Sequence, residues 1–257
     1  MTIALSVGCA VLGLAVGSFL NVLVWRVPRK ESVVRPRSHC PSCGTQLAGR
    51  DNVPVVSWLA LRGRCRTCST WISVRYPLLE LTCGALFAGT AAYFGPSYRL
   101  PAYLVLGASL IALSAIDFEH KLLPSKIIFP TGFTVAALLL LAALAEGEPR
   151  RIVWSAIGAA GCFGAFFALH LISPGGMAYG DVRLSFVLGM AVGWLGLGLV
   201  PLFLFVSFLV SAVTGVTYAV VTGKGLKAAI PFGPFLALGA GVAIFVGRPL
   251  VDAYLGT

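Results

Sequence analysis

Residues 3–25 read IALSVGCAVLGLAVGSFLNVLVW, an apolar run without a single Lys, Arg, Asp or Glu. An α-helix needs about 20 predominantly apolar residues to cross the hydrocarbon core of a bilayer, which is about 30 Å thick. Further apolar runs follow at residues 78–95, 101–116, 127–145, 152–172, 184–199, 201–221 and 232–250. We therefore expect an all-α integral membrane protein with about eight transmembrane helices.

The composition also indicates that lipid is the solvent of this chain. Of its 257 residues, 58% are hydrophobic and only 11% are charged, and the mean hydropathy is +0.92. A soluble domain normally has about 25% charged residues, so this chain has too few to cover a surface in water. No Lys or Arg precedes the first run, which argues against a cleaved signal peptide and for a retained first helix.

The run at 184–199 is short, and Pro201 separates it from the run at 201–221. These two runs could therefore form a single re-entrant hairpin in place of two transmembrane helices. Glycines inside the helices, such as Gly158, Gly161 and Gly164, are expected to let neighbouring helices pack closely.

A polar segment at residues 26–77 separates the first two runs and carries 10 basic and 2 acidic residues. Basic residues favour the cytoplasmic side of a membrane. With this segment inside, alternating helices place 15 of the 19 Lys and Arg in cytoplasmic segments (26–77, 117–126, 173–183 and 222–231). The N-terminus is then outside. This rule accounts for the basic charge without a nucleic-acid partner.

The expected domain organisation follows from these segments. Residues 1–25 form the first transmembrane helix, residues 26–77 a cytoplasmic loop domain, and residues 78–257 a transmembrane core.

The loop domain contains two Cys-x-x-Cys pairs, at Cys40 with Cys43 and at Cys65 with Cys68. This spacing suits tetrahedral Zn²⁺, and a site closed by four cysteines is normally structural. Free thiols or a redox pair remain alternatives, whereas structural disulfides are disfavoured in the reducing cytoplasm.

Two aspartates, Asp117 and Asp181, lie at ends of apolar runs that the topology places on the cytoplasmic side. Two neighbouring carboxylates can share a proton and act as acid and base in peptide hydrolysis. Gly180 would let a peptide backbone approach closely. Each aspartate could instead be an ordinary interfacial charge or helix cap.

Three other polar residues stand near the ends of the first two helices. Asn21 and Arg26 lie at the cytoplasmic end of the first, where Arg26 could extend to the lipid headgroups. Glu80 begins the second.

Several motifs, taken together and in chain order, resemble those of type IV prepilin peptidases. They are GSFLNVLVWRVP at 17–28, the four cysteines, DNVPVVSW at 51–58, RGRC at 62–65, SVRYPLLE at 73–80, ID at 116–117 with LP at 123–124, GDVRL at 180–184 and PFGPFLALG at 231–239. The resemblance covers almost the whole chain.

The resemblance implies a membrane-embedded aspartyl peptidase of the bacterial inner membrane. It implies Asp117 and Asp181 as the catalytic pair and a cysteine loop that binds zinc. The expected substrates are prepilins or pseudopilins, cleaved after a glycine, and many members of the family methylate the new N-terminus with S-adenosylmethionine. No glycine-rich nucleotide loop is visible to support this second activity.

Three positions depart from the family pattern. Ala178 replaces the first glycine of the GxGD motif, Arg183 replaces a common Lys, and Ser125 replaces an acid that often follows Leu-Pro. None of them removes a proposed catalytic carboxylate. We expect Gly180, Arg183, Asn21 and Glu80 to support substrate binding or local structure.

Two other classes of function also fit a polytopic chain. A transporter with the aspartates as a proton relay predicts acids deep inside helices, whereas these lie near helix ends. A non-enzymatic scaffold of a pilus or secretion machine predicts that both aspartates tolerate substitution.

Overall fold

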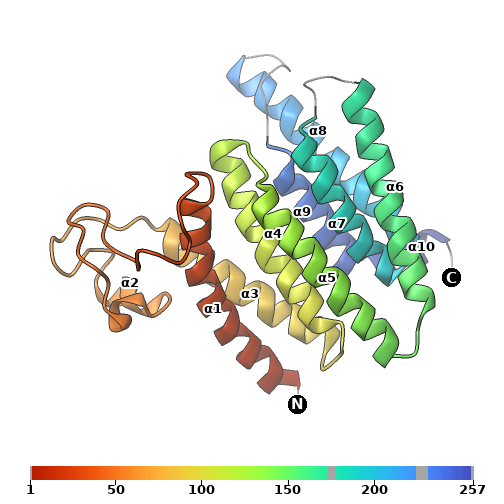
Figure 1. Cartoon of the computed structure of the whole chain (residues 1–257). Helices are drawn as coiled ribbons and strands as arrows, with labels where there is room; N and C mark the ends of the chain where they lie inside the picture. The colour runs from red at the N-terminus through yellow and green to blue at the C-terminus, as the bar shows by residue number, and fades with distance from the viewer. Residues whose placement is uncertain (1, 173–176, 224–230, 256–257) are drawn as a thin grey trace. The chain divides into compact units, whose positions relative to one another are not determined.

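The computed structural model describes residues 2–172, 177–223 and 231–255, with side chains as far as residue 253. Within these residues the chain forms helices and loops, with two isolated antiparallel bridges and no β-strand (Figure 1). The chain divides into two units: unit 1 comprises residues 1–100 and 104–112, and unit 2 comprises residues 101–103 and 113–257.

Unit 1 contains two long helices, two short ones and part of a further helix. These elements are α1 (Thr2–Arg26), η1 (Gly49–Asn52), α2 (Val56–Ala60), α3 (Arg75–Phe94) and α4 (Leu100–His120), the last of which contributes to both units. The polar segment expected between the first two membrane helices is present as residues 27–74, and η1 and α2 are its only helices.

The long helices α1 and α3 pack side by side (Figure 1). A Cβ atom on Gly13 would lie 2.7 Å from the Cys83 carbonyl oxygen, and one on Gly17 would lie 2.7 Å from the Glu80 Cα atom. A larger residue at either position would therefore separate the backbones. Such small-residue contacts drive helix association where lipid removes the hydrophobic driving force.

Unit 2 is a bundle of six helices together with the end of α4. These six are α5 (Ser125–Ala145), α6 (Arg150–Ile172), α7 (Tyr179–Leu195), α8 (Leu199–Thr222), α9 (Gly233–Phe245) and α10 (Gly247–Leu255). Helix α7 packs against α5, α6, α8 and α9 and is buried along most of its length from Asp181 onward. Every residue from Val187 to Leu195 is buried, and this part of the helix is apolar on all sides, as expected of a helix enclosed by its neighbours.

A close helix contact in unit 2 joins α6 to α7. A Cβ atom on Gly158 would collide with the Gly189 carbonyl oxygen and would lie 3.0 Å from the Gly193 Cα atom. Cβ atoms on Gly161 and Gly164 would meet nothing within 4 Å. The expected packing role is therefore confirmed for Gly158 and wrong for the other two.

Within the described residues, six helices are long and apolar enough to cross a membrane, namely α1, α3, α4, α5, α6 and α8, and the bent pair α9 and α10 could make a seventh. Helix α7 has only 17 residues, which at about 1.5 Å per residue is shorter than a typical hydrocarbon core. The chain is thus a multi-pass membrane protein, and the expected number of about eight spans is approximate.

Several boundaries differ from the sequence expectation. Helix α7 begins at Tyr179, so Asp181 lies within its first turn, and α8 begins at Leu199, so Pro201 lies within that helix. The loops expected at 173–183 and 222–231 lie partly outside the described residues.

The run at 232–250 was expected to be one helix but forms two, bent by 68°. The break has a steric cause. In a continuous helix the ring of Pro249 would clash with the carbonyl group of Phe245, four residues earlier, and would remove a hydrogen bond. Helix α9 accordingly ends at Phe245.

The contact between α6 and α7 predicts opposite effects for two substitutions on one helix. Gly158→Ala should destabilise the detergent-purified protein by about 2 kcal/mol, because an added Cβ overpacks a backbone contact. Gly161→Ala should be neutral or stabilise by up to about 1 kcal/mol, because alanine favours the helix and the space is open. Thermal unfolding measures both, and equal effects would show that the contact is not formed.

Candidate functional site

Asp117 lies near the end of α4, and its side chain belongs to the core of unit 2. The residue is 5% exposed, and its Oδ2 atom accepts a hydrogen bond from the Gly233 backbone N–H at 2.9 Å. The amide that begins α9 thereby fixes the orientation of the carboxylate. An amide donor can hold a buried carboxylate without adding a second full charge.

Asp181 lies in the first turn of α7 and is also 5% exposed. It interacts electrostatically with Asp117. Unit 2 therefore brings together the two carboxylates that the sequence singled out, although 63 positions separate them along the chain. A carboxylate at a helix N-terminus also interacts favourably with the helix dipole.

Close contacts between backbone and side chains frame this pair. A Cβ atom on Gly233 would lie 2.9 Å from Asp117 Oδ2 and 3.0 Å from Leu123 Cδ2. A Cβ atom on Gly180 would lie 2.8 Å from Leu123 Cβ. Leu123 thus contacts both glycine segments, and only glycine fits at either position without displacing it.

Sequence reasoning assigned no role to Gly233 or Leu123, although both lie in quoted motifs. Gly233 lies in the motif at 231–239, within the segment Pro231-Phe-Gly-Pro-Phe. The signal in the sequence was the presence of Pro231 and Pro234 on either side of Gly233. Prolines restrict the backbone conformation, and here they restrict the segment that presents the Gly233 amide.

Arg183 lies one half-turn beyond Asp181 on α7, and its guanidinium donates a hydrogen bond to the Ser125 hydroxyl. It also lies over two rings, 4.4 Å from the centroid of Tyr179 and 5.4 Å from that of Phe129. Two departures from the family pattern, Ser125 and Arg183, are therefore in direct contact. A hydroxyl oxygen can accept a hydrogen bond from an arginine.

In unit 1, Asn21 joins α1 to α3, and Glu80 holds the loop to α3. Asn21 Nδ2 donates to the carbonyl oxygens of Gly17 at 3.3 Å and Tyr76 at 3.2 Å. Glu80 Oε2 accepts a hydrogen bond of 2.7 Å from the N–H of Val55, a residue with a φ of 61°. The carboxylate thus secures a turn with a positive φ just before α2.

Arg26 also turns toward the loop. It is 6% exposed, and its guanidinium donates to the carbonyl oxygens of Ser32 at 2.9 Å and Pro36 at 2.8 Å. The expectation that Arg26 extends to the lipid headgroups is wrong, because these two carbonyls satisfy the guanidinium within the protein.

The four cysteines of the loop converge in unit 1. The sulfur atoms of Cys40, Cys43, Cys65 and Cys68 all lie within 4.8 Å of one another, a cluster that could hold a metal ion. All four are free thiols. Hydrogen bonds with Thr70 lower the pKa of Cys68 to about 6. A thiol that ionises easily is suited to metal binding, because the thiolate is the ligand.

The two cysteine pairs have the same backbone structure. In the first, Cys40 N donates to Thr45 O and Gly44 N donates to Cys40 O, each at 2.9 Å. In the second, Cys65 N donates to Thr70 O and Ser69 N donates to Cys65 O, also at 2.9 Å. The residue after the second cysteine has a positive φ in both, 69° at Gly44 and 57° at Ser69.

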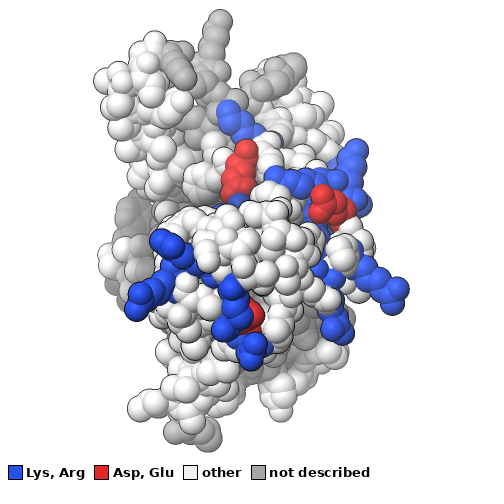
Figure 2. All heavy atoms as spheres, turned by 90° about the vertical axis from the view of Figure 1, so that its left-hand side faces the viewer, with Lys and Arg blue, Asp and Glu red and all other residues white. Residues whose placement is uncertain are grey.

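Basic side chains are prominent around this loop. Figure 2 looks onto the side of the molecule that carries it, where Lys and Arg are widespread and Asp and Glu form only small patches. One of the few acids, Asp51, pairs with Arg66 at 2.7 Å.

Comparison with known proteins bears on this architecture. The family model described as "Bacterial Peptidase A24 N-terminal domain" matches residues 11–94, and the model described as "Type IV leader peptidase family" matches residues 104–220. A relative from Stutzerimonas stutzeri is 36% identical over 276 residues, which cover 96% of this chain and 93% of the relative. The chain belongs to the type IV leader peptidase family. The resemblance inferred from the motifs is confirmed.

Other relatives of this leader peptidase carry similar names. The Stutzerimonas protein is named "Prepilin leader peptidase/N-methyltransferase". A protein of Escherichia coli O78:H11, 36% identical over 95% of this chain and 94% of its own length, is a "Type 4 prepilin-like proteins leader peptide-processing enzyme". A Myxococcus xanthus relative is 41% identical over 83% of this chain and 63% of its own length. No solved structure gives a significant match.

The two cysteine pairs share one backbone geometry, so removing the glycine of the first pair and adding a glycine to the second should have opposite effects on the stability of the loop. A residue other than glycine costs about 1–2 kcal/mol in the left-handed region. Gly44→Ala should therefore raise the rate of limited proteolysis of residues 27–74 about fivefold, whereas Ser69→Gly should lower it about twofold.

Gly49→Ala is the matched control in the same segment. Gly49 has no positive φ, and a Cβ atom there would meet nothing within 4 Å. Equal proteolysis rates in Gly44→Ala and Gly49→Ala would contradict the assigned backbone geometry.

Proposed function

We propose that this chain is an aspartyl endopeptidase that removes leader peptides from type IV prepilins or pseudopilins. One observation carries the proposal: Asp117 and Asp181 are buried, come from separate helices and interact electrostatically. Membership of the leader peptidase family and the names of the relatives support it.

The chemistry follows from paired carboxylates. One accepts a proton from the water that attacks the scissile carbonyl carbon, and the other donates a proton to the carbonyl oxygen or the leaving amine. The Gly233 amide keeps Asp117 oriented between these steps. The hydrogen bond to a backbone N–H, together with the tight contact at Leu123, limits reorganisation of the site during the reaction.

The glycines beside the carboxylates suit a peptide substrate. An extended peptide must bring its backbone close to both acids, and bulky side chains next to them would block this approach. Gly180 precedes Asp181 directly, and Gly233 contacts Asp117. We assign Arg183 to supporting this segment through Ser125.

A second proposed activity is N-methylation of the new N-terminus with S-adenosylmethionine. It rests on the names of the relatives, which join prepilin leader peptidase to N-methyltransferase. The acceptor is the amino group that cleavage exposes, so peptide hydrolysis would come first.

The cysteine cluster is proposed to bind structural Zn²⁺ through Cys40, Cys43, Cys65 and Cys68. Four thiolates complete a tetrahedral shell and leave no position for water or substrate. The ion would tie together two distant parts of a loop that has little apolar core of its own. Its contribution would be to order the loop, not to perform hydrolysis.

The proposed location is the bacterial inner membrane, with the N-terminus outside and the active site facing the cytoplasm. The basic charge of residues 27–74 supports this orientation, because Lys and Arg are retained on the cytoplasmic side. Leader peptides of proteins awaiting export would be presented on the same side.

Replacing either aspartate tests the peptidase. Asp117→Asn and Asp181→Asn should each lower the rate of prepilin cleavage at least about 100-fold, because each removes one partner of the acid–base pair. Glu119→Gln is the control, since Glu119 is an exposed carboxylate on the same helix. Cleavage is followed with detergent-purified protein of verified thermal stability. A folded aspartate variant with normal activity would exclude that residue from catalysis.

Metal analysis tests the zinc site. The purified protein should contain about one Zn²⁺ per chain, and Cys40→Ser or Cys65→Ser should lose it, because three thiolates bind far more weakly than four. Chelation should also increase proteolysis of residues 27–74. Cys9→Ser, outside the cluster, should retain the metal. A wild-type protein purified without chelators and found free of zinc would contradict the assignment.

A further inference from the structure

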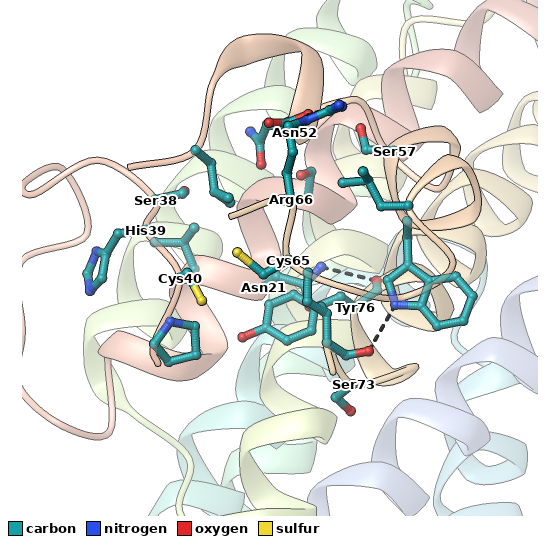
Figure 3. Close-up of a pocket in the computed structure, with 18 of the residues that line it drawn as sticks. Asn21, Ser38, His39, Cys40, Asn52, Ser57, Cys65, Arg66, Ser73 and Tyr76 are labelled. Carbon is teal, nitrogen blue, oxygen red and sulfur yellow. Dashed lines mark hydrogen bonds and ion pairs between the residues drawn. The ribbon is translucent and has the colours of Figure 1, made fainter. Parts of the chain in front are cut away.

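The short helix α2 in the loop of unit 1 has an inward and an outward face. Ser57 and Trp58 turn inward and line a cavity of about 620 Å³ that the loop encloses with the ends of α1 and α3 (Figure 3). Ser57 Oγ donates to the Val53 carbonyl oxygen at 2.8 Å, and Trp58 Nε1 donates to the Ile72 carbonyl oxygen at 3.0 Å. These bonds fix the inward face of α2 within the loop.

The outward face of α2 is apolar. Val56 and Leu59, which lie about one helical turn apart, are each 62% exposed and take no part in lining the cavity. Val53, three positions before Val56, is 45% exposed and adds a third apolar side chain to this stretch. Apolar side chains that gather on an exposed face are typical of surfaces that bind a protein or a membrane.

The level of α2 along the membrane helices indicates what covers this face. The Val55 N–H, directly before α2, donates to Glu80 Oε2 at 2.7 Å. Glu80 lies opposite Gly17, since a Cβ atom on Gly17 would lie 2.7 Å from the Glu80 Cα atom. Gly17 precedes Arg26, the last residue of α1, by nine positions, which is about 13.5 Å at 1.5 Å per residue. The loop therefore folds back beside α1 and α3, and α2 begins well short of the end of α1.

Both membrane helices expose apolar side chains at this level. Phe19 of α1 is 50% exposed, and Leu81 of α3, next to Glu80, is 49% exposed. Such side chains face lipid, because a membrane-spanning helix is surrounded by lipid wherever no protein covers it. The apolar face of α2 thus lies at the same level as the lipid-facing surface of α1 and α3, where the headgroup region of the bilayer meets its hydrocarbon core.

Basic side chains flank the apolar face of α2 along the chain. Arg50 precedes it, Arg62 and Arg64 follow it, and all three residues are exposed. Figure 2 shows Lys and Arg spread over this side of the molecule. Guanidinium groups bind phosphates well, and an anionic membrane surface attracts basic segments. An apolar face with basic residues beside it is typical of a helix that lies in the membrane interface.

We infer that the outward face of α2 docks on the surface of an anionic phospholipid membrane. Val56 and Leu59 enter the interface between headgroups and acyl chains, and Arg50 and Arg62 bind headgroup phosphates. The partner is lipid because α2 lies beside helices that lipid surrounds. Docking fixes the loop from its outer side, while the bonds of Ser57 and its neighbours hold the inner side. This interaction requires neither peptide hydrolysis nor a bound metal, so it goes beyond the proposed function.

Hydrogen exchange in nanodiscs that hold one chain each tests this docking. The full-length protein is placed in discs of phosphatidylcholine alone and in discs with an equal share of phosphatidylglycerol. Amides of residues 56–62 should exchange about tenfold more slowly in the anionic discs, because docking suppresses local opening. Leu59→Ser should abolish this difference, and Arg62→Gln should reduce it to about twofold, since one basic residue contributes about fivefold near an anionic surface. Val34→Ser is the matched control, because Val34 is 77% exposed in the same loop but lies outside α2.

Slower exchange in the anionic discs, abolished by Leu59→Ser and kept in Val34→Ser, supports docking on lipid. Equal exchange in the two kinds of disc, or an unchanged difference in Leu59→Ser, overturns it. Protection that appears only when a disc holds two chains, or only when a prepilin is added, assigns the face to a second copy or to the substrate and also overturns lipid docking. Prepilin cleavage by the wild type in the same discs tests the peptidase separately.

Discussion

Unit 2 depends on a backbone contact between α6 and α7, where Gly158 meets Gly189 and Gly193. Lipid tails are as apolar as the side chains, so apolar side chains gain little free energy when helices associate in a membrane. Close packing and hydrogen bonds must therefore hold the helices together. The absence of side chains at this contact lets α7 occupy the centre of the bundle, enclosed by its neighbours. Because α7 carries Asp181 in its first turn, the same contact positions one of the two proposed catalytic groups.

The proposed active site follows from this central helix. Asp117 comes from α4, and its carboxylate is oriented by the amide of Gly233 at the start of α9. Leu123 contacts both glycine segments, so three parts of the chain meet around the acids. Arg183 and Ser125, which each differ from the family pattern, bond to each other. This bond joins the start of α5 to the first turns of α7.

In unit 1, close packing of two helices supports a polar loop. Its two long helices meet at Gly13 and Gly17 and are joined by Asn21, and the loop between them is attached through Glu80 and Arg26. These buried polar groups are satisfied largely by backbone atoms of the loop. A loop with little apolar core of its own gains order from such bonds and from the cysteine cluster, and a cavity remains beneath it.

The sequence by itself determined that the chain spans the membrane several times, which residues could carry chemistry, and which family the motifs resemble. These properties follow from local composition and spacing, because an apolar run or a Cys-x-x-Cys pair has the same meaning wherever it lies. The tertiary structure decided which groups meet. Neither the Gly233 amide on Asp117 nor the bond between Arg183 and Ser125 could be read from the chain, because both join residues more than fifty positions apart. The break before α10 was readable from Pro249, whereas the position of α7 was not, because only packing against its neighbours makes a 17-residue helix the centre of the bundle.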